Sequence, residues 1–78
     1  MGVLEDILKT RWNYAATLFL DKDATLDDLR EAVETLEDAE RIARRVFGGA
    51  HPNAVEIGES LRTARAVLRA REDAVAAA

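Results

Sequence analysis

The stretch that decides the fold is residues 26–47, which read LDDLREAVETLEDAERIARRVF. Its apolar residues recur with a period of about 3.5, which places them on one face of an α-helix. They are Leu26, Leu29, Val33, Leu36, Ala39, Ala43, Val46 and Phe47. At a rise of about 1.5 Å per residue, this helix would be about 33 Å long. Because no alternating β-branched run favours a strand elsewhere, the sequence predicts an all-α fold.

Both ends of this stretch carry signals of a helix boundary. Thr25 is the expected N-cap, and Asp28 stands three residues later, as in a capping box. Gly48 follows the last apolar residue and can take the left-handed conformation that ends a helix. Acidic residues come first and arginines come last, which matches the helix macrodipole. We expect ion pairs between residues four apart on this helix, namely Glu37 with Arg41 and Glu40 with Arg44.

Helices are also expected on either side of this stretch. The first runs from about residue 3 to residue 20, and the third from about residue 53 to residue 73. The apolar stripe expected in the first helix consists of Leu4, Ile7, Leu8, Tyr14, Ala15 and Leu18, with Trp12 and Phe19 flanking it. The apolar side expected in the third helix consists of Val55, Ile57, Leu61, Ala64, Val67 and Leu68.

The third helix has its own expected start and end. Asn53, just after Pro52, is the predicted N-cap, with Glu56 at the capping-box position. The alanine-rich end, residues 74–78, has good helix propensity but little to pack against, so we expect it to fray. Three helices joined by short connections predict antiparallel neighbours, in a single domain that covers residues 1–78.

The composition excludes several classes of function. The chain has 78 residues, 49% of them hydrophobic and 33% charged, which is typical of a small folded domain. It has no cysteine, which excludes thiolate metal sites and cysteine nucleophiles, and its net charge of −4 disfavours a nucleic-acid partner. No apolar run reaches the ~20 residues that cross a bilayer, and the N-terminus lacks the pattern of a signal peptide. We therefore expect a cytoplasmic protein with no membrane partner.

No set of residues predicts an active site. His51 is the single histidine, and we interpret it as a loop residue that shapes the start of the third helix. Glu31, Glu34, Glu37, Asp38 and Glu40 lie opposite the apolar stripe and lack the Glu-x-x-His pattern of a helical di-metal site. The arginines Arg41, Arg44, Arg45, Arg62, Arg65 and Arg69 are explained by the helix dipoles. We expect no enzyme activity, no metal and no cofactor.

The order of motifs resembles the tetratricopeptide repeats of the kinesin light chain type. Asn13-Tyr14-Ala15 stands where that family has Asn-Leu-Ala, and Ala32 stands at the small position of the second helix. Phe47-Gly48 and His51-Pro52 stand where the family has Leu-Gly and His-Pro. The resemblance covers about residues 10–61, which is one repeat and the first helix of another. It implies the C-terminal or capping part of a repeat array.

This resemblance implies a scaffold for protein–protein interaction without catalytic activity, with a polypeptide partner. The residues expected to contact that partner are Arg11, Trp12 and Asn13, because they lie beside the apolar stripe rather than in it. The alternative is a self-associating bundle, such as a homodimer, that serves as an oligomerisation module. In that case the stripe Leu29, Val33, Leu36, Ala43, Val46 and Phe47 would be partly shared between two chains.

Overall fold

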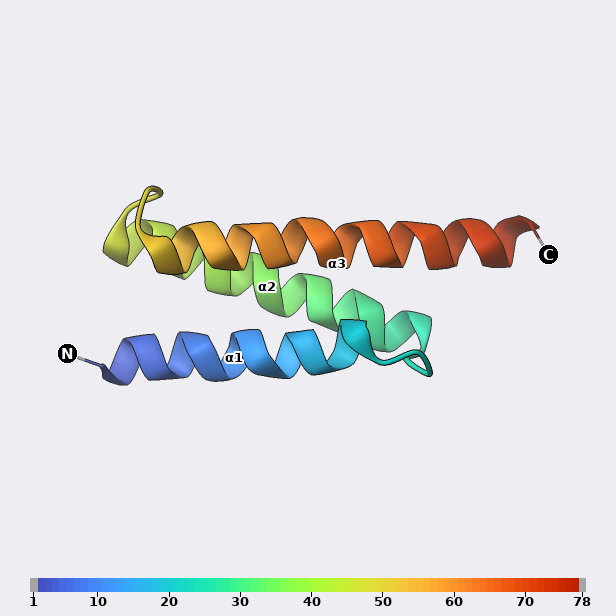
Figure 1. Cartoon of the computed structure of the whole chain (residues 1–78), viewed down its shortest axis with the longest axis horizontal. Helices are drawn as coiled ribbons and strands as arrows, with labels where there is room; N and C mark the ends of the chain where they lie inside the picture. Colours follow the sequence, from blue (N-terminus) through green and yellow to red (C-terminus); the bar gives the residue numbers. More distant parts are fainter. Residues whose placement is uncertain (1, 78) are drawn as a thin grey trace.

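The computed structural model describes residues 2–77 and contains three α-helices, with no strand in that range (Figure 1). They are α1 (Val3–Leu20), α2 (Leu26–Phe47) and α3 (Pro52–Ala77). The all-α fold class and the bounds of the first two helices are as expected from the sequence. The third helix begins one residue earlier and runs four residues further than its predicted span of 53–73. The fraying expected at the C-terminus is not seen through Ala77, while Met1 and Ala78 lie outside the described residues.

The boundaries of α2 form as the sequence predicts. The Thr25 hydroxyl accepts a hydrogen bond from the Asp28 N–H, and the Asp28 carboxylate accepts one from the Thr25 N–H, both at 3.1 Å. This reciprocal capping box satisfies two backbone donors at the helix start. At the other end, Gly48 has a φ of 91° and donates its N–H to the Arg44 carbonyl. A residue with a Cβ would be strained at that φ.

The cap of α3 is His51, whereas the sequence predicted Asn53. The Nδ1 atom of His51 accepts a hydrogen bond from the Asn53 N–H at 3.1 Å, and the His51 carbonyl accepts one from the Val55 N–H. Pro52 takes the first helical position, where its fixed φ fits and its missing N–H needs no partner. The cap therefore falls one residue before the proline. The imidazole also stacks on Phe47, with ring centroids 4.7 Å apart.

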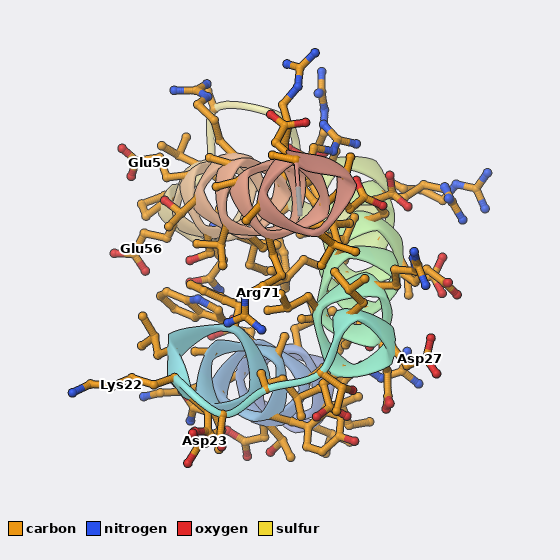
Figure 2. All side chains as sticks on the ribbon, turned by 90° about the vertical axis from the view of Figure 1, so that its right-hand side faces the viewer. Lys22, Asp23, Asp27, Glu56, Glu59 and Arg71 are labelled. Atoms are coloured by element: carbon orange, nitrogen blue, oxygen red, sulfur yellow. The ribbon has the colours of Figure 1, made fainter. Side chains whose placement is uncertain are left out.

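The three helices occupy three corners around one core. In Figure 1 the chain turns back after α1 and again after α2, and α2 crosses obliquely between the other two helices. Seen end-on in Figure 2, α1 lies below, α3 above and α2 to one side. Helix α2 packs against both neighbours, whereas α1 and α3 touch each other much less. The fourth corner, opposite α2, is not covered by any helix of residues 2–77.

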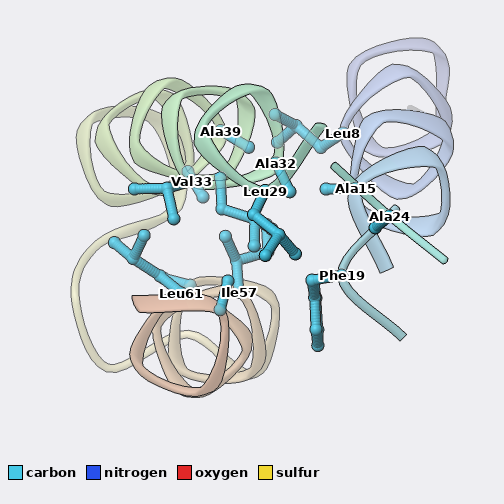
Figure 3. Close-up of a cluster of buried hydrophobic side chains, with 14 residues drawn as sticks. Leu8, Ala15, Phe19, Ala24, Leu29, Ala32, Val33, Ala39, Ile57 and Leu61 are labelled. Atoms are coloured by element: carbon cyan, nitrogen blue, oxygen red, sulfur yellow. The ribbon is translucent and has the colours of Figure 1, made fainter. Parts of the chain in front are cut away.

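The core is built around a seam of α2 that is fully buried. It consists of Leu29, Ala32, Leu36, Ala39 and Ala43. The alanines let the neighbouring helices approach closely, while the leucines fill the space between them (Figure 3). Truncating a buried leucine such as Leu36 to alanine typically costs about 2–5 kcal/mol. Within residues 2–77, no polar or charged residue is buried in this core.

Several residues expected in the apolar stripes lie outside the core. Ile7 and Tyr14 of α1 are 46% and 49% exposed, whereas Phe19, expected only to flank the stripe, is 7% exposed. The buried face of α1 is turned toward α3 as well as α2. Phe19 lies on that face and is buried, whereas Ile7 and Tyr14 lie on the outer side of the helix. Val46 and Val55 are likewise half-exposed, because Ala43 and Ala54 take the core positions beside them.

The ion pairs on α2 also differ from those expected. Glu37 pairs with Arg65 of α3 at 2.8 Å, rather than with Arg41, which pairs with Asp38 at 3.1 Å. Among residues 2–77, Glu40 and Arg44 form no ion pair. The Glu37 carboxylate therefore pairs with an arginine of α3 and not with an arginine of its own helix. No described helix has the length and apolar composition needed to cross a bilayer.

Candidate binding groove between α1 and α3

A groove runs between α1 and α3 on the side opposite α2. It contains two hollows, and we call the whole feature the α1–α3 groove. The first hollow has a volume of about 450 Å³ and is lined by Glu5, Asp6, Leu8, Lys9, Trp12, Asn53, Glu56 and Ile57. The second has a volume of about 400 Å³ and is lined by Trp12, Ala16, Phe19, Leu20, Glu56, Glu59, Ser60 and Thr63.

Trp12 lies at the junction of the two hollows and lines both. It is half-buried, and its indole Nε1–H donates a hydrogen bond to the Ser60 hydroxyl of α3 at 2.7 Å. The bond satisfies the polar atom of a ring that otherwise packs against the core. Trp12 therefore links α1 to α3 and still presents part of its ring surface to the groove.

The floor of the groove is apolar. Leu8 and Ile57, which are buried core residues, form the base of the first hollow. Phe19 and the partly buried Ala16 form the base of the second. Figure 3 shows Phe19 on the side of the core away from α2, toward the corner that no helix covers. The groove thus opens onto the same core that holds the three helices together.

The rim of the groove is acidic. Its charged residues are Glu5, Asp6, Glu56 and Glu59, with Lys9 as the single base lining the two hollows. Figure 2 shows Glu56 and Glu59 projecting from α3 on the open side. Within residues 2–77, none of these four carboxylates forms an ion pair. With four carboxylates and one lysine, the rim carries a net negative charge, although Glu59 also lines another hollow together with Arg44 and Arg62.

Arg71 lies beyond the second hollow, where α3 passes the loop that joins α1 to α2. Its guanidinium donates hydrogen bonds to the carbonyl oxygens of Ala24, at 2.6 Å, and Lys22, at 3.4 Å. Figure 2 shows Arg71 between α3 and this loop. These bonds hold the loop against α3 and separate the groove from the part of α3 that extends past it.

The three residues expected to contact a partner do not share one surface. Trp12 lies in the α1–α3 groove, whereas Arg11 lines a shallow hollow on the α1–α2 side, beside Tyr14 and Glu31. Asn13 is exposed, and its backbone carbonyl accepts a hydrogen bond from the Thr17 hydroxyl. Successive helical residues point about 100° apart, so Arg11 and Asn13 lie on opposite sides of Trp12.

The hollow beside Arg11 has one perturbed group. The Tyr14 hydroxyl donates a hydrogen bond to Glu31 Oε2 at 2.7 Å, which joins α1 to α2 at the surface. This bond raises the pKa of Tyr14 above its ordinary value, and the negative charge of Glu31 raises that pKa further. The pair is a surface contact that joins α1 to α2.

Several of the ionisable residues that could carry chemistry make structural contacts in the fold. His51 uses Nδ1 to cap α3. Within residues 2–77 there is no group of three or more His, Cys, Asp or Glu residues placed to hold a metal ion. Arg62, Arg65 and Arg69 line a shallow hollow on the outer side of α3, where Arg65 is paired with Glu37.

Most residues of the α1–α3 groove could not be identified from the sequence. The sequence predicts a capping-box role for Glu56 and places Phe19 beside the first apolar stripe, and it gives no specific role to Ser60 or Glu59. The signal that could have found them is Trp12, whose N–H needs an acceptor when it is half-buried. Which helix supplies that acceptor depends on packing across 48 positions of sequence.

No protein-family model, no curated protein and no solved structure matches this chain.

Proposed function

We propose that this chain is a non-catalytic interaction module, and that its α1–α3 groove binds a segment of another polypeptide. The observation that carries the proposal is the open corner opposite α2. There an apolar floor and a partly exposed Trp12 face outward between two helices. A helix or extended segment laid in that groove would bury the apolar surface that the chain leaves open.

The properties of Trp12 support binding rather than simple packing. Tryptophan is enriched among the residues that dominate binding energy, because one ring buries a large apolar area with little loss of conformational freedom. The hydrogen bond to Ser60 fixes the ring before a partner arrives. A pre-positioned side chain loses less entropy on binding than a free one.

We further propose that the helices are packed antiparallel in the manner of a tetratricopeptide unit and the first helix of another. The order of the three helices supports this arrangement, as does the full burial of Ala32 at the small position of α2. The His51–Pro52 pair at the start of α3 supports it as well, because the two residues together set the entry into that helix.

Self-association remains the alternative function. However, most of the α2 stripe that would be shared between two chains is already buried within one chain. Of the α2 residues expected to be shared between two chains, Leu29, Leu36 and Ala43 are fully buried and Val33 is 9% exposed within one chain. Phe47 is partly buried against the same core, and Val46 is 51% exposed. A dimer would therefore have to form through another surface than this stripe.

Chemical-shift mapping tests the proposed function. The probe is a set of synthetic amphipathic peptides of about 18 residues, a helix of about 27 Å, with leucines two turns apart and varied polar positions. At least one peptide should shift the Trp12 indole N–H signal together with the amides of Leu8, Ala16 and Ile57. If no peptide shifts these signals, or if the shifts map to the outer arginines of α3, the α1–α3 groove is not the binding surface.

A further inference from the structure

From the shape and charge of the α1–α3 groove, we infer that its occupant is a basic amphipathic helix of a partner protein. This inference rests on the proposed function and adds the chemistry of the partner to it. Three properties of the groove carry it: its position at a vacant helical corner, the spacing of its two hollows, and its acidic rim.

The vacant corner fits a helix. The groove follows α1 from Glu5 to Leu20, which is about 22 Å at 1.5 Å per residue. A helix of about 15 residues has the same length. Both walls of the groove are helices, so a helical occupant would complete a four-helix arrangement whose side chains interdigitate in the ordinary way.

The two hollows set the spacing of the occupant's apolar residues. Leu8 marks the first hollow and Ala16 the second, eight residues apart on α1, or about 12 Å. A helix places side chains about 10–12 Å apart on one face at positions i and i+7 or i+8. The residue between them passes over Trp12 and should be small. The expected occupant therefore carries two large apolar residues two turns apart, with alanine, serine or glycine midway.

The acidic rim sets the charge of the occupant. Glu5 and Asp6 stand in the first turn of α1, where the helix dipole favours acids. Glu56 and Glu59 lie beyond the first turn of α3, where that effect has faded, so the dipole does not explain their place. Lysine or arginine residues flanking the apolar face of a partner helix would lie beside these four carboxylates. The rim would repel a helix with acidic flanks.

A second copy of this chain fits the groove poorly. Its nearest equivalent to a basic surface is the outer side of α3, a hollow lined by Arg62, Ala66, Leu68, Arg69, Ala70, Glu72, Asp73 and Arg65, which is paired with Glu37. The two alanines are too small to fill the hollows of the groove, and Leu68 is partly buried against the core of its own chain. Of the larger apolar side chains that the chain exposes, Ile7 and Val46 lie on other helices than these arginines. Val55 and Val75 lie on α3, but they stand 20 positions, or about 30 Å, apart and so do not match hollows about 12 Å apart. The partner is therefore a different polypeptide.

Three synthetic peptides test the inference on the full chain. They share leucines at i and i+7 with alanine midway, and their flanking positions are all lysine, all glutamine or all glutamate. Binding is measured by fluorescence anisotropy of the labelled peptide, and the site by the Trp12 indole shift. We expect the lysine peptide to bind at least tenfold more tightly than the glutamine peptide in low salt. Its advantage should shrink as salt is added, and the glutamate peptide should be weakest.

Charge variants locate the effect. The double variant Glu56→Gln/Glu59→Gln should weaken the lysine peptide about fivefold and leave the glutamine peptide unchanged. The matched control, Glu34→Gln/Asp38→Asn, removes two carboxylates from the exposed side of α2 and should change neither. Equal effects of the two double variants would mean that net charge alone attracts the lysine peptide, and would overturn the inference.

The remaining outcomes separate this inference from the proposed function. If the glutamine peptide binds the groove as tightly as the lysine peptide, the groove is a binding site but the basic partner is wrong. If no peptide binds, both proposals fail. If the groove signals shift with protein concentration in the absence of peptide, a second copy occupies the groove, and the inference is overturned in favour of self-association.

Discussion

The indole N–H of Trp12 donates a hydrogen bond of 2.7 Å to the hydroxyl of Ser60, the one side-chain hydrogen bond between α1 and α3 within residues 2–77. It spans two helices that otherwise touch little. The bond has two consequences. It links the two helices that have the fewest contacts with each other, and it fixes the indole ring that lies between the two hollows of the groove.

Replacing Ser60 with alanine should therefore destabilise the fold by about 1 kcal/mol, the usual contribution of such a hydrogen bond. Urea unfolding followed by far-ultraviolet circular dichroism measures this change. The control is Thr63→Ala, three residues along the same helix, whose hydroxyl bonds to the Glu59 carbonyl of its own helix. Equal stability of the two variants would show that the Trp12–Ser60 bond contributes nothing.

Arg71 should stabilise the loop between α1 and α2. Arg71→Ala removes the donors to the Ala24 and Lys22 carbonyls and should lower the free energy of unfolding by about 1–2 kcal/mol. Hydrogen exchange at residues 21–25 should become faster. Arg69→Ala removes an exposed arginine two positions away and should change stability by less than about 0.5 kcal/mol. Unchanged exchange in the loop of Arg71→Ala would contradict this role.

The cap of α3 should depend on His51 rather than on Asn53. His51→Ala removes both the Nδ1 acceptor and the stack on Phe47, and should cost about 1 kcal/mol or more in thermal or urea unfolding. His51→Asn restores an acceptor and should recover part of that loss. Asn53→Ala should be close to neutral. A larger loss of stability for Asn53→Ala than for His51→Ala would indicate that Asn53 caps α3, as the sequence predicted.

The pKa of Tyr14 should depend on the hydrogen bond that its hydroxyl donates to Glu31. Because that bond raises the pKa of Tyr14 in the folded chain, the pair stabilises the fold below the ordinary tyrosine pKa. This stabilisation is lost as the pH rises through the raised folded value. Tyr14 is the single tyrosine, so its phenolate absorbance can be followed alone. Glu31→Ala should lower the apparent pKa, whereas Glu34→Ala should not, and equal titration curves would contradict the assignment.

Much of the fold follows from local sequence signals. The parts that could not be predicted in this way depend on how the helices pack against one another. The capping box at Thr25 and the stop at Gly48 depend on neighbouring residues, so both were predictable. The face of α1 was not, because Ile7 and Phe19 are both apolar and only the position of α3 decides which is buried. Likewise, asparagine is a common N-cap residue, but α3 begins at Pro52, so the cap falls at His51 and not at Asn53.

The groove was less predictable than the fold. The position of Trp12 beside the apolar stripe predicts a surface role, and Trp12 lines the groove. Arg11 and Asn13 were chosen for the same reason, yet the helix turns them to other sides. Glu56 was assigned to a capping box and lies instead on the groove rim, because the cap is His51. Such placements depend on contacts between helices, which spacing along one helix does not reveal.

If a partner binds in the α1–α3 groove, then filling the groove with a larger side chain should block binding. Ala16 forms part of the second hollow, and Ala66 lies on the outer side of α3, so Ala16→Phe and Ala66→Phe add the same ring in two places. Both variants are first checked for helical content by circular dichroism. The measurement is the affinity of the lysine peptide for each, by fluorescence anisotropy. We predict at least a tenfold loss for Ala16→Phe and none for Ala66→Phe, whereas equal affinity for the two folded variants would contradict binding in the groove.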